Sequence, residues 1–143
     1  MVLPTYAMEA KVMAKVIKDN FPGQATFLLA QDDEFGSDGV AGFKTAGHTF
    51  SSTPILYPQG SMTAARAEGA LTSLAAAAPG KPVLVLFGTT DVTATILKAA
   101  EKLELTKKFT FLAGSVGADA NTLLALGVKS TTCLLYTSDA ADE

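Results

Sequence analysis

The uninterrupted apolar run Val83–Phe87 constrains the fold of this 143-residue chain more than any other feature. An apolar run of this length that includes β-branched valines is typical of a strand that is covered on both faces of a sheet. Ala25–Ala30 is a similar run, and Phe109–Ala113 is predicted as a third strand. Thr53–Tyr57 is predicted as a short fourth strand, in which Pro54 favours the strand start or a sheet edge.

Segments with the apolar spacing of amphipathic helices separate these strands. They are Tyr6–Asn20, a segment through Val40 and Phe43 towards Ala46, Thr63–Ala78, Val92–Leu103 and Asp119–Leu126. Strands that alternate with helices of this length require crossover connections. The sequence therefore predicts one α/β domain, a doubly wound parallel sheet with helices on both faces.

Composition excludes several classes of protein. Apolar residues make up 48% of the chain and charged residues 17%, which argues against intrinsic disorder. A net charge of -3 provides no basic surface for nucleic acid, so no nucleic-acid partner is expected. The uncharged stretch Gly69–Gly80 contains Thr72 and Ser73 and is shorter than the roughly 20 apolar residues that a membrane span needs. With one cysteine and one histidine, neither an internal disulfide nor a zinc site is expected.

Both ends of the chain suggest a fragment. Met1–Thr5 shows neither the charged nor the apolar region of a signal peptide. Cys133–Glu143 resembles the translation of an adapter used in shotgun sequencing, and we interpret it as read-through rather than native sequence. A natural polar tail is the alternative. We therefore assign residues 1–132 to the domain and expect residues 133–143 to belong to no regular element. The alternative is that the apolar run Cys133–Leu135 extends a strand that begins at Val128.

Ligands of doubly wound sheets bind at the carboxyl ends of the strands, where helix N-termini also lie. This rule selects three loops, at residues 31–39, 88–91 and 114–118. The first contains Asp32, Asp33 and Glu34, which we interpret as a solvated acidic loop that caps the next helix. The alternative is a receiver-type magnesium site. That site needs an aspartate and a lysine where this chain has Gly88 and Gly114.

Other enzyme classes find little support in the sequence. Gly114–Gly117 lacks the glycine spacing of a nucleophile elbow. Its two glycines match only half of the dinucleotide-binding fingerprint, which is weak evidence for a nucleotide site. The only histidine, His48, follows a predicted helix and is expected at the amino edge of the sheet, away from the three loops. No trio of residues forms a credible catalytic triad or metal cluster. We therefore expect no enzymatic activity, cofactor or metal.

The order of several short motifs is recognisable. Pro4–Ala7 precedes a helix, Asp32–Gly36 follows a strand, and Gly42–Lys44, Tyr57–Gly60 and Leu86–Gly88 come in sequence after them. This series resembles the leucine/isoleucine/valine-type periplasmic binding proteins of ABC transporters, which have the type I solute-binding fold. The resemblance covers Leu3 to about Thr132 and corresponds to most of the second lobe.

The resemblance implies a mechanism and a set of partners. Two lobes close about a hinge over a small solute, an amino acid or analogue, and the closed form is presented to a membrane permease. The first lobe of the same chain would then be a partner, and the location periplasmic or otherwise extracytoplasmic. The sensing domain of a receptor with the same fold is an alternative, and a receiver-like or other α/β enzyme domain is an alternative of another class.

The resemblance also implies ligand-binding residues: Phe35, Thr89, Thr90, Asp91 and Ser115. Phe35 matches an aromatic that contacts the solute, although capping the sheet is an equal alternative. Thr90 stands where leucine-binding members have a second aromatic, and Ser115 where amino-acid binders have a glutamate for the ligand ammonium. Both departures argue against an ordinary branched-chain amino acid. Asp91 is the alternative ammonium partner, or else a helix N-cap.

Overall fold

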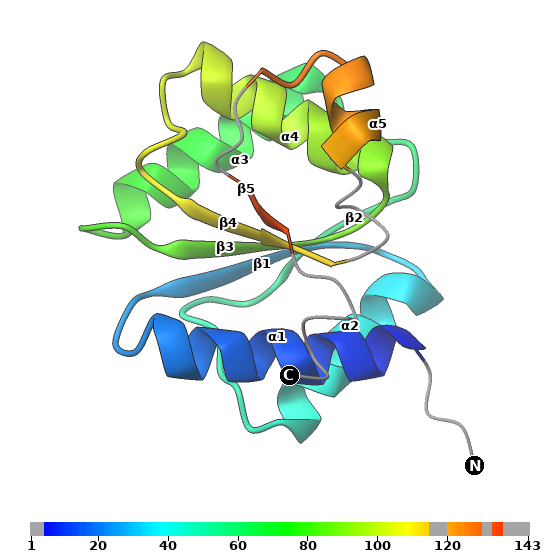
Figure 1. Cartoon of the computed structure of the whole chain (residues 1–143), viewed down its shortest axis with the longest axis vertical. Helices are drawn as coiled ribbons and strands as arrows, with labels where there is room; N and C mark the ends of the chain where they lie inside the picture. The colour runs from blue at the N-terminus through cyan, green and yellow to red at the C-terminus, as the bar shows by residue number, and fades with distance from the viewer. Residues whose placement is uncertain (1–4, 115–119, 130–132, 136–143) are drawn as a thin grey trace.

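The computed structural model describes residues 5–114, 120–129 and 133–135 of the chain. Helices and strands alternate throughout these residues (Figure 1). In chain order they are α1 (Thr5–Asn20), β1 (Thr26–Gln31), α2 (Glu34–Thr45), β2 (Ile55–Tyr57), α3 (Ala64–Ala77), β3 (Val83–Phe87), α4 (Thr90–Lys102), β4 (Thr110–Ala113), α5 (Ala120–Ala125) and β5 (Cys133–Leu135).

The strands form one parallel sheet in the order β2-β1-β3-β4-β5. Helices α1 and α2 cover one face, and α3, α4 and α5 cover the other (Figure 1). The predicted doubly wound α/β fold is therefore confirmed. The predicted strand containing Pro54 is confirmed as the edge strand β2, which is shorter than expected and begins at Ile55.

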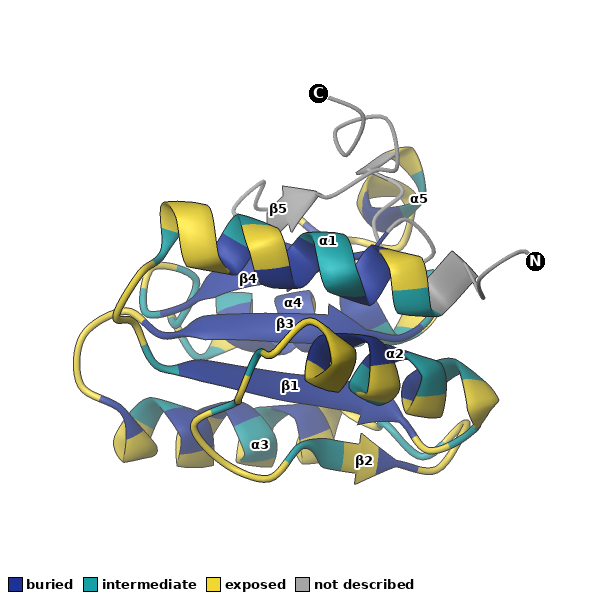
Figure 2. Cartoon of the chain, turned by 90° about the horizontal axis from the view of Figure 1, so that it is seen from below, coloured by how far each residue is buried: buried dark blue, intermediate teal, exposed yellow. Residues whose placement is uncertain are grey.

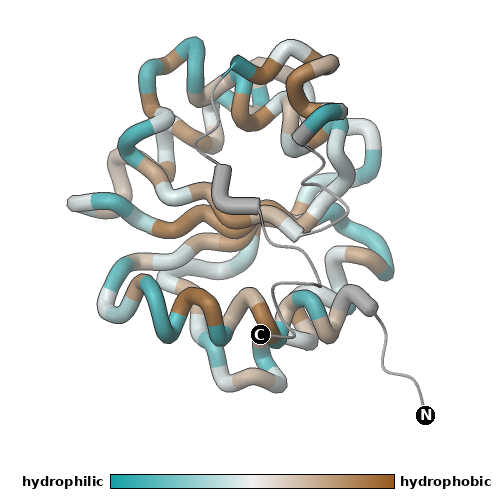
Figure 3. The backbone as a smooth tube through the Cα atoms, in the orientation of Figure 1, coloured by the Kyte–Doolittle hydropathy of each residue, from teal (hydrophilic) through white to brown (hydrophobic). Residues whose placement is uncertain are grey.

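The central strands are buried on both faces, as their continuous apolar sequence predicts. All six residues of β1 and all five of β3 are buried (Figure 2). Alternate residues of β3 face opposite ways, so that Leu84 and Leu86 join the core beneath α3 and α4, while Val85 and Phe87 join the core beneath α1 and α2. The hydropathy of the chain agrees with this burial, because apolar residues lie along the central strands (Figure 3).

Three buried glycines, Gly36, Gly39 and Gly42, bring α2 close to its neighbours. A Cβ at Gly36 would overlap the carbonyl oxygen of Gln31, and one at Gly39 would come within 2.6 Å of the Phe87 ring. At Gly42 the obstacle is the carbonyl oxygen of Ala7, also at 2.6 Å. The spacing of three residues places these glycines on one face of the helix. This close approach holds the first turn of α2 at the carboxyl edge of the sheet.

The carboxyl-terminal segment corrects one expectation. Cys133–Leu135 forms β5 and pairs in parallel with β4, with Phe111 opposite Cys133 and Ala113 opposite Leu135. The expectation that residues 133–143 belong to no regular element is therefore wrong for these three residues, because the backbone of an apolar run can complete the edge of a parallel sheet. Residues 136–143 lie outside the described part of the chain, and the non-native origin of the segment stays a prediction.

Candidate functional site

The candidate site lies at the carboxyl edge of the sheet, where β1 and β3 are neighbours. From β1 the chain crosses to the edge strand β2, whereas from β3 it crosses in the other direction to β4. Ligands of open α/β sheets bind at such a switch point, outside the carboxyl ends of the strands. Helices α2 and α4 both begin at this edge (Figure 1).

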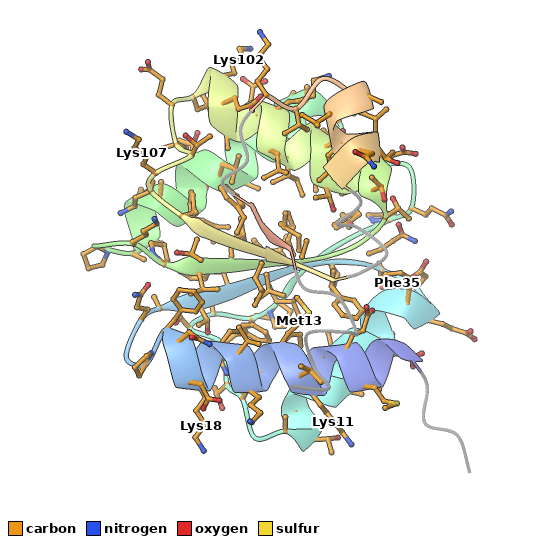
Figure 4. All side chains as sticks on the ribbon, viewed as in Figure 1. Lys11, Met13, Lys18, Phe35, Lys102 and Lys107 are labelled. Atoms are coloured by element: carbon orange, nitrogen blue, oxygen red, sulfur yellow. The ribbon has the colours of Figure 1, made fainter. Side chains whose placement is uncertain are left out.

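Phe35 forms an aromatic contact at this edge. It lies in the first turn of α2 (Figure 4). Its ring meets that of Phe87 edge-to-face, with centroids 5.0 Å apart and planes at 69°. Phe87 is the last residue of β3 and is buried, whereas Phe35 is only half-buried. Phe35 therefore caps the sheet, which was one of its two expected roles, and the contact with a solute stays a prediction.

The acidic loop caps α2, as expected. Asp33 is the N-cap residue, and one of its carboxylate oxygens accepts a hydrogen bond from the Gly36 amide at 3.2 Å. The other oxygen accepts from the side-chain amide of Gln31, which is buried at the end of β1. Asp32 is exposed. Within the described residues, no group of three histidine, cysteine, aspartate or glutamate side chains is placed to hold a metal ion.

Tyr57 is a buried residue of this edge that the sequence reasoning missed. It ends β2 with 3% of its surface exposed, and a Cβ at Gly88 would overlap its hydroxyl. Burial, together with the negative charge of Asp33, raises the pKa of Tyr57 to about 12. The hydroxyl therefore stays protonated at neutral pH and occupies the space beside the first residue after β3. Its position as the last residue of a predicted strand was the available signal.

Three of the predicted residues lie at the beginning of α4. Thr89 is the N-cap, with an extended backbone and a hydroxyl that makes no capping hydrogen bond, and Thr90 is the first helical residue. Asp91 lies inside the first turn and is exposed. The interpretation of Asp91 as an N-cap is therefore wrong, because the helix begins two residues earlier than that role requires. Ser115 lies outside the described residues.

Glu9 is a second residue that the sequence reasoning missed. It is 4% exposed, and its carboxylate lies beside Gly114, the residue that follows β4. It shares the sheet-facing side of α1 with Met13, four residues later. A glutamate on the apolar face of a helix was the signal that could have found it.

His48 lies at the opposite edge, as predicted. Its Nε2 is 3.0 Å from the Thr26 hydroxyl at the start of β1, and its ring packs against Phe43 and Phe50. Burial lowers the pKa of His48 from its ordinary value. A hollow of about 690 Å³ adjoins it, lined in part by Lys11, Lys18, Gln24 and Ser51. This hollow is not the expected ligand site, because it lies at the amino ends of the strands.

An open parallel sheet with its polar and aromatic groups gathered at the switch point is the architecture of a ligand-binding α/β domain. The sequence profile of the periplasmic binding protein family matches residues 1–142, and the chain belongs to this family. No curated protein sequence matches the chain significantly.

Membership has several consequences for function. Proteins of this family bind small-molecule ligands outside the cytoplasm and are generally not enzymes. Across the described residues, none of the helices combines the length and the apolar character that crossing a membrane requires. The match of the family profile to residues 1–142 confirms the resemblance to a periplasmic binding protein at the level of the family.

Proposed function

We propose that this chain forms the second lobe of the solute-binding protein of an ABC transporter, with amino acids or related small polar solutes as ligands. In this proposal a first lobe closes over the solute about a hinge, and the closed form is presented to a membrane permease. One observation carries the proposal: at the switch point, the half-buried Phe35 ring packs against Phe87 beside the start of α4. The chain also belongs to a family of ligand-binding proteins.

Each group at this edge has a role in the proposal. The exposed part of the Phe35 ring packs against the apolar part of the solute, because burying apolar surface is the main favourable term in such contacts. The hydroxyls of Thr89 and Thr90 and the amides of the first turn of α4 hold a carboxylate or amide oxygen, which the positive end of the helix dipole favours. Asp91 and Ser115 are proposed as further polar contacts.

Titration calorimetry on the intact two-lobed protein tests the proposal. With a panel of the twenty amino acids, we expect at least one to bind with a dissociation constant in the micromolar range. The 143-residue chain alone is the control and is expected to bind the same solute more weakly than about 1 mM. One wall buries only part of a ligand, whereas good sites bury roughly 70–90% of its surface. Absence of binding to the intact protein would contradict an amino-acid ligand.

A second measurement separates transport from sensing. The liganded protein is added to its reconstituted permease, and ATP hydrolysis is followed. Stimulation that requires both solute and protein supports the transport function. Solute binding without stimulation favours the receptor alternative.

A further inference from the structure

The hollow at the amino edge of the sheet lies between α1 and the loop that follows α2. Its volume of about 690 Å³ is in the range of small-molecule sites, roughly 300–1,000 Å³. The buried residues Ala14, Ile17 and Thr26 belong to its lining, so the hollow reaches down to the core. It lies at the opposite ends of the strands from the proposed solute site and is separate from it.

The α1 side of the hollow carries positive charge. Lys11, Lys15 and Lys18 line it, and spacings of four and three residues place them on one face of the helix. Lys11 and Lys18 extend from the same side of α1 (Figure 4) and form no ion pair with any described residue. Lys15 lies 3.7 Å from Asp19 in an exposed pair, which is a weak interaction. None of the described lining residues is acidic, although the chain as a whole has a net charge of -3.

The opposite wall is polar and is tied to the sheet. The Thr26 amide donates to the Ser51 hydroxyl oxygen at 2.9 Å, and the Ser51 amide donates to the Thr26 carbonyl at 2.8 Å. His48 Nε2 lies 3.0 Å from the Thr26 hydroxyl. These contacts fix the loop after α2 at the start of β1. The hydroxyls of Thr49 and Ser51 and the side-chain amide of Gln24 add neutral hydrogen-bond donors to the lining.

This arrangement suits an anion with more than one charge. A single ion pair at an exposed lysine contributes little, so a singly charged anion gains little there. A phosphate monoester carries about -1.5 to -2 charges at pH 7 and three strong acceptor oxygens, so it interacts with several ammonium groups at once. Lysine binds phosphate as a point charge and needs no fixed geometry. The hollow is larger than one phosphate group, which leaves room for an organic part against Ala14 and Ile17.

We propose that this hollow is a second binding site, in which Lys11, Lys15 and Lys18 hold the phosphate monoester group of a ligand. The inference does not depend on the proposed function, because it concerns the other edge of the sheet. The same phosphate chemistry is presented by free organic phosphates and by lipid headgroups, and the experiment distinguishes these two sources.

The test follows His48 by proton NMR in the 143-residue chain, because it is the only histidine and belongs to the lining. Burial lowers the pKa of His48, so at pH 7.5 its ring is neutral and its signal does not report titration. Glycerol 3-phosphate is expected to shift the ring signals saturably, with a dissociation constant of about 1–10 mM, because the cations are exposed to solvent. Glycerol, and sodium chloride at matched ionic strength, should give no saturable shift.

Paired lysine variants test the assignment. Lys11→Gln with Lys18→Gln should weaken binding of glycerol 3-phosphate by about tenfold. Lys102→Gln with Lys107→Gln removes the same charge on the other side of the sheet (Figure 4) and should change the affinity by less than about twofold. Circular dichroism checks that both variants fold, as exposed lysine-to-glutamine changes should allow.

Vesicles identify the source of the phosphate. Phosphatidylcholine vesicles with and without phosphatidic acid are sedimented with the chain. Binding that needs both phosphatidic acid and the α1 lysines assigns the site to a lipid headgroup, whereas binding of glycerol 3-phosphate alone assigns it to a free organic phosphate.

Three outcomes overturn the inference. One is a wild-type chain that responds neither to glycerol 3-phosphate nor to phosphatidic acid. Another is an equal response to sodium chloride, which would show general screening rather than a site. The third is an equal loss of affinity in the two paired variants, which would make net charge the cause. No amino-acid solute is used, so these outcomes leave the proposed function untouched.

Discussion

The rings of Phe35 and Phe87 meet edge-to-face at the carboxyl end of β3, with their centroids 5.0 Å apart. The contact joins the first turn of α2 to the last residue of the central strand. Because Phe35 is only half-buried, the same ring stabilises the lobe and offers an apolar surface at the ligand edge.

Replacing Phe35 with alanine should affect both roles. We expect the free energy of unfolding to fall by about 1–3 kcal/mol, from lost burial and the lost aromatic pair. In the intact protein, solute affinity should fall by a similar amount, whereas Asp32→Asn should change it by less than about 0.5 kcal/mol. Urea unfolding and calorimetry measure the two effects. Loss of binding in Asp32→Asn with no effect of Phe35→Ala would reverse the roles assigned to the loop.

Gly88 should tolerate alanine only when the Tyr57 hydroxyl is removed. An added Cβ overlaps that hydroxyl but would lie 3.6 Å from the ring carbon that bears it, an ordinary contact. Gly88→Ala should therefore cost about 1–3 kcal/mol of stability, because a tyrosine that is only 3% exposed has little room to move. In the background of Tyr57→Phe the same change should cost at least about 1 kcal/mol less. Additive effects in this double-mutant cycle would show that the hydroxyl is not the obstacle.

Replacing two helical glycines with alanine should change the stability of the protein in opposite directions. Gly36→Ala in α2 should destabilise the protein by more than about 3 kcal/mol or prevent folding, because the new methyl group meets the backbone carbonyl of Gln31. Gly69→Ala in α3 should stabilise it by about 0.5–1 kcal/mol, since that position is exposed and has open space around it. Thermal unfolding of the two variants measures both changes in stability. Equal effects would mean that α2 does not approach β1 this closely.

His48 should make the stability depend on pH. Burial lowers the pKa of His48 below its ordinary value of 6.5, so the folded protein favours the neutral ring and the unfolded chain binds the proton more readily. Its contribution is therefore complete above pH 6.5 and declines as the pH falls below that value. His48→Gln does not titrate and should lose less stability than the wild type between pH 7.5 and pH 5. Urea unfolding measures the free energy of unfolding of both proteins across this pH range. The same pH dependence in the wild type and in His48→Gln would contradict this role.

The fold could be predicted because its elements carry strong local signals. Val83–Phe87 matches β3 to the residue, and Thr63 acts as the N-cap of α3 where the sequence placed the start of that helix. The three residues of β5 were predicted as a strand only in the alternative, because a short apolar run beside a polar tail has no periodicity, and only pairing with β4 reveals it.

The site was predicted less completely, because it depends on tertiary contacts. The loops at the switch point follow from topology alone, and with them the positions of Phe35, Thr89 and Thr90. Glu9 and Tyr57 reach the same edge from α1 and β2, through packing against Gly114 and Gly88. No motif joins these pairs in the sequence, since each is separated by more than 30 residues.

Hydrogen–deuterium exchange on the intact protein, with and without its best solute, tests the central claim most directly. The account predicts that the solute protects peptides covering residues 32–36 and 88–92, which form the carboxyl edge at β1 and β3. Peptides covering residues 46–51, beside the hollow at the amino edge, should exchange at an unchanged rate. Protection confined to residues 11–26 and 46–51, with none at the carboxyl edge, would place the ligand in that hollow and contradict the account.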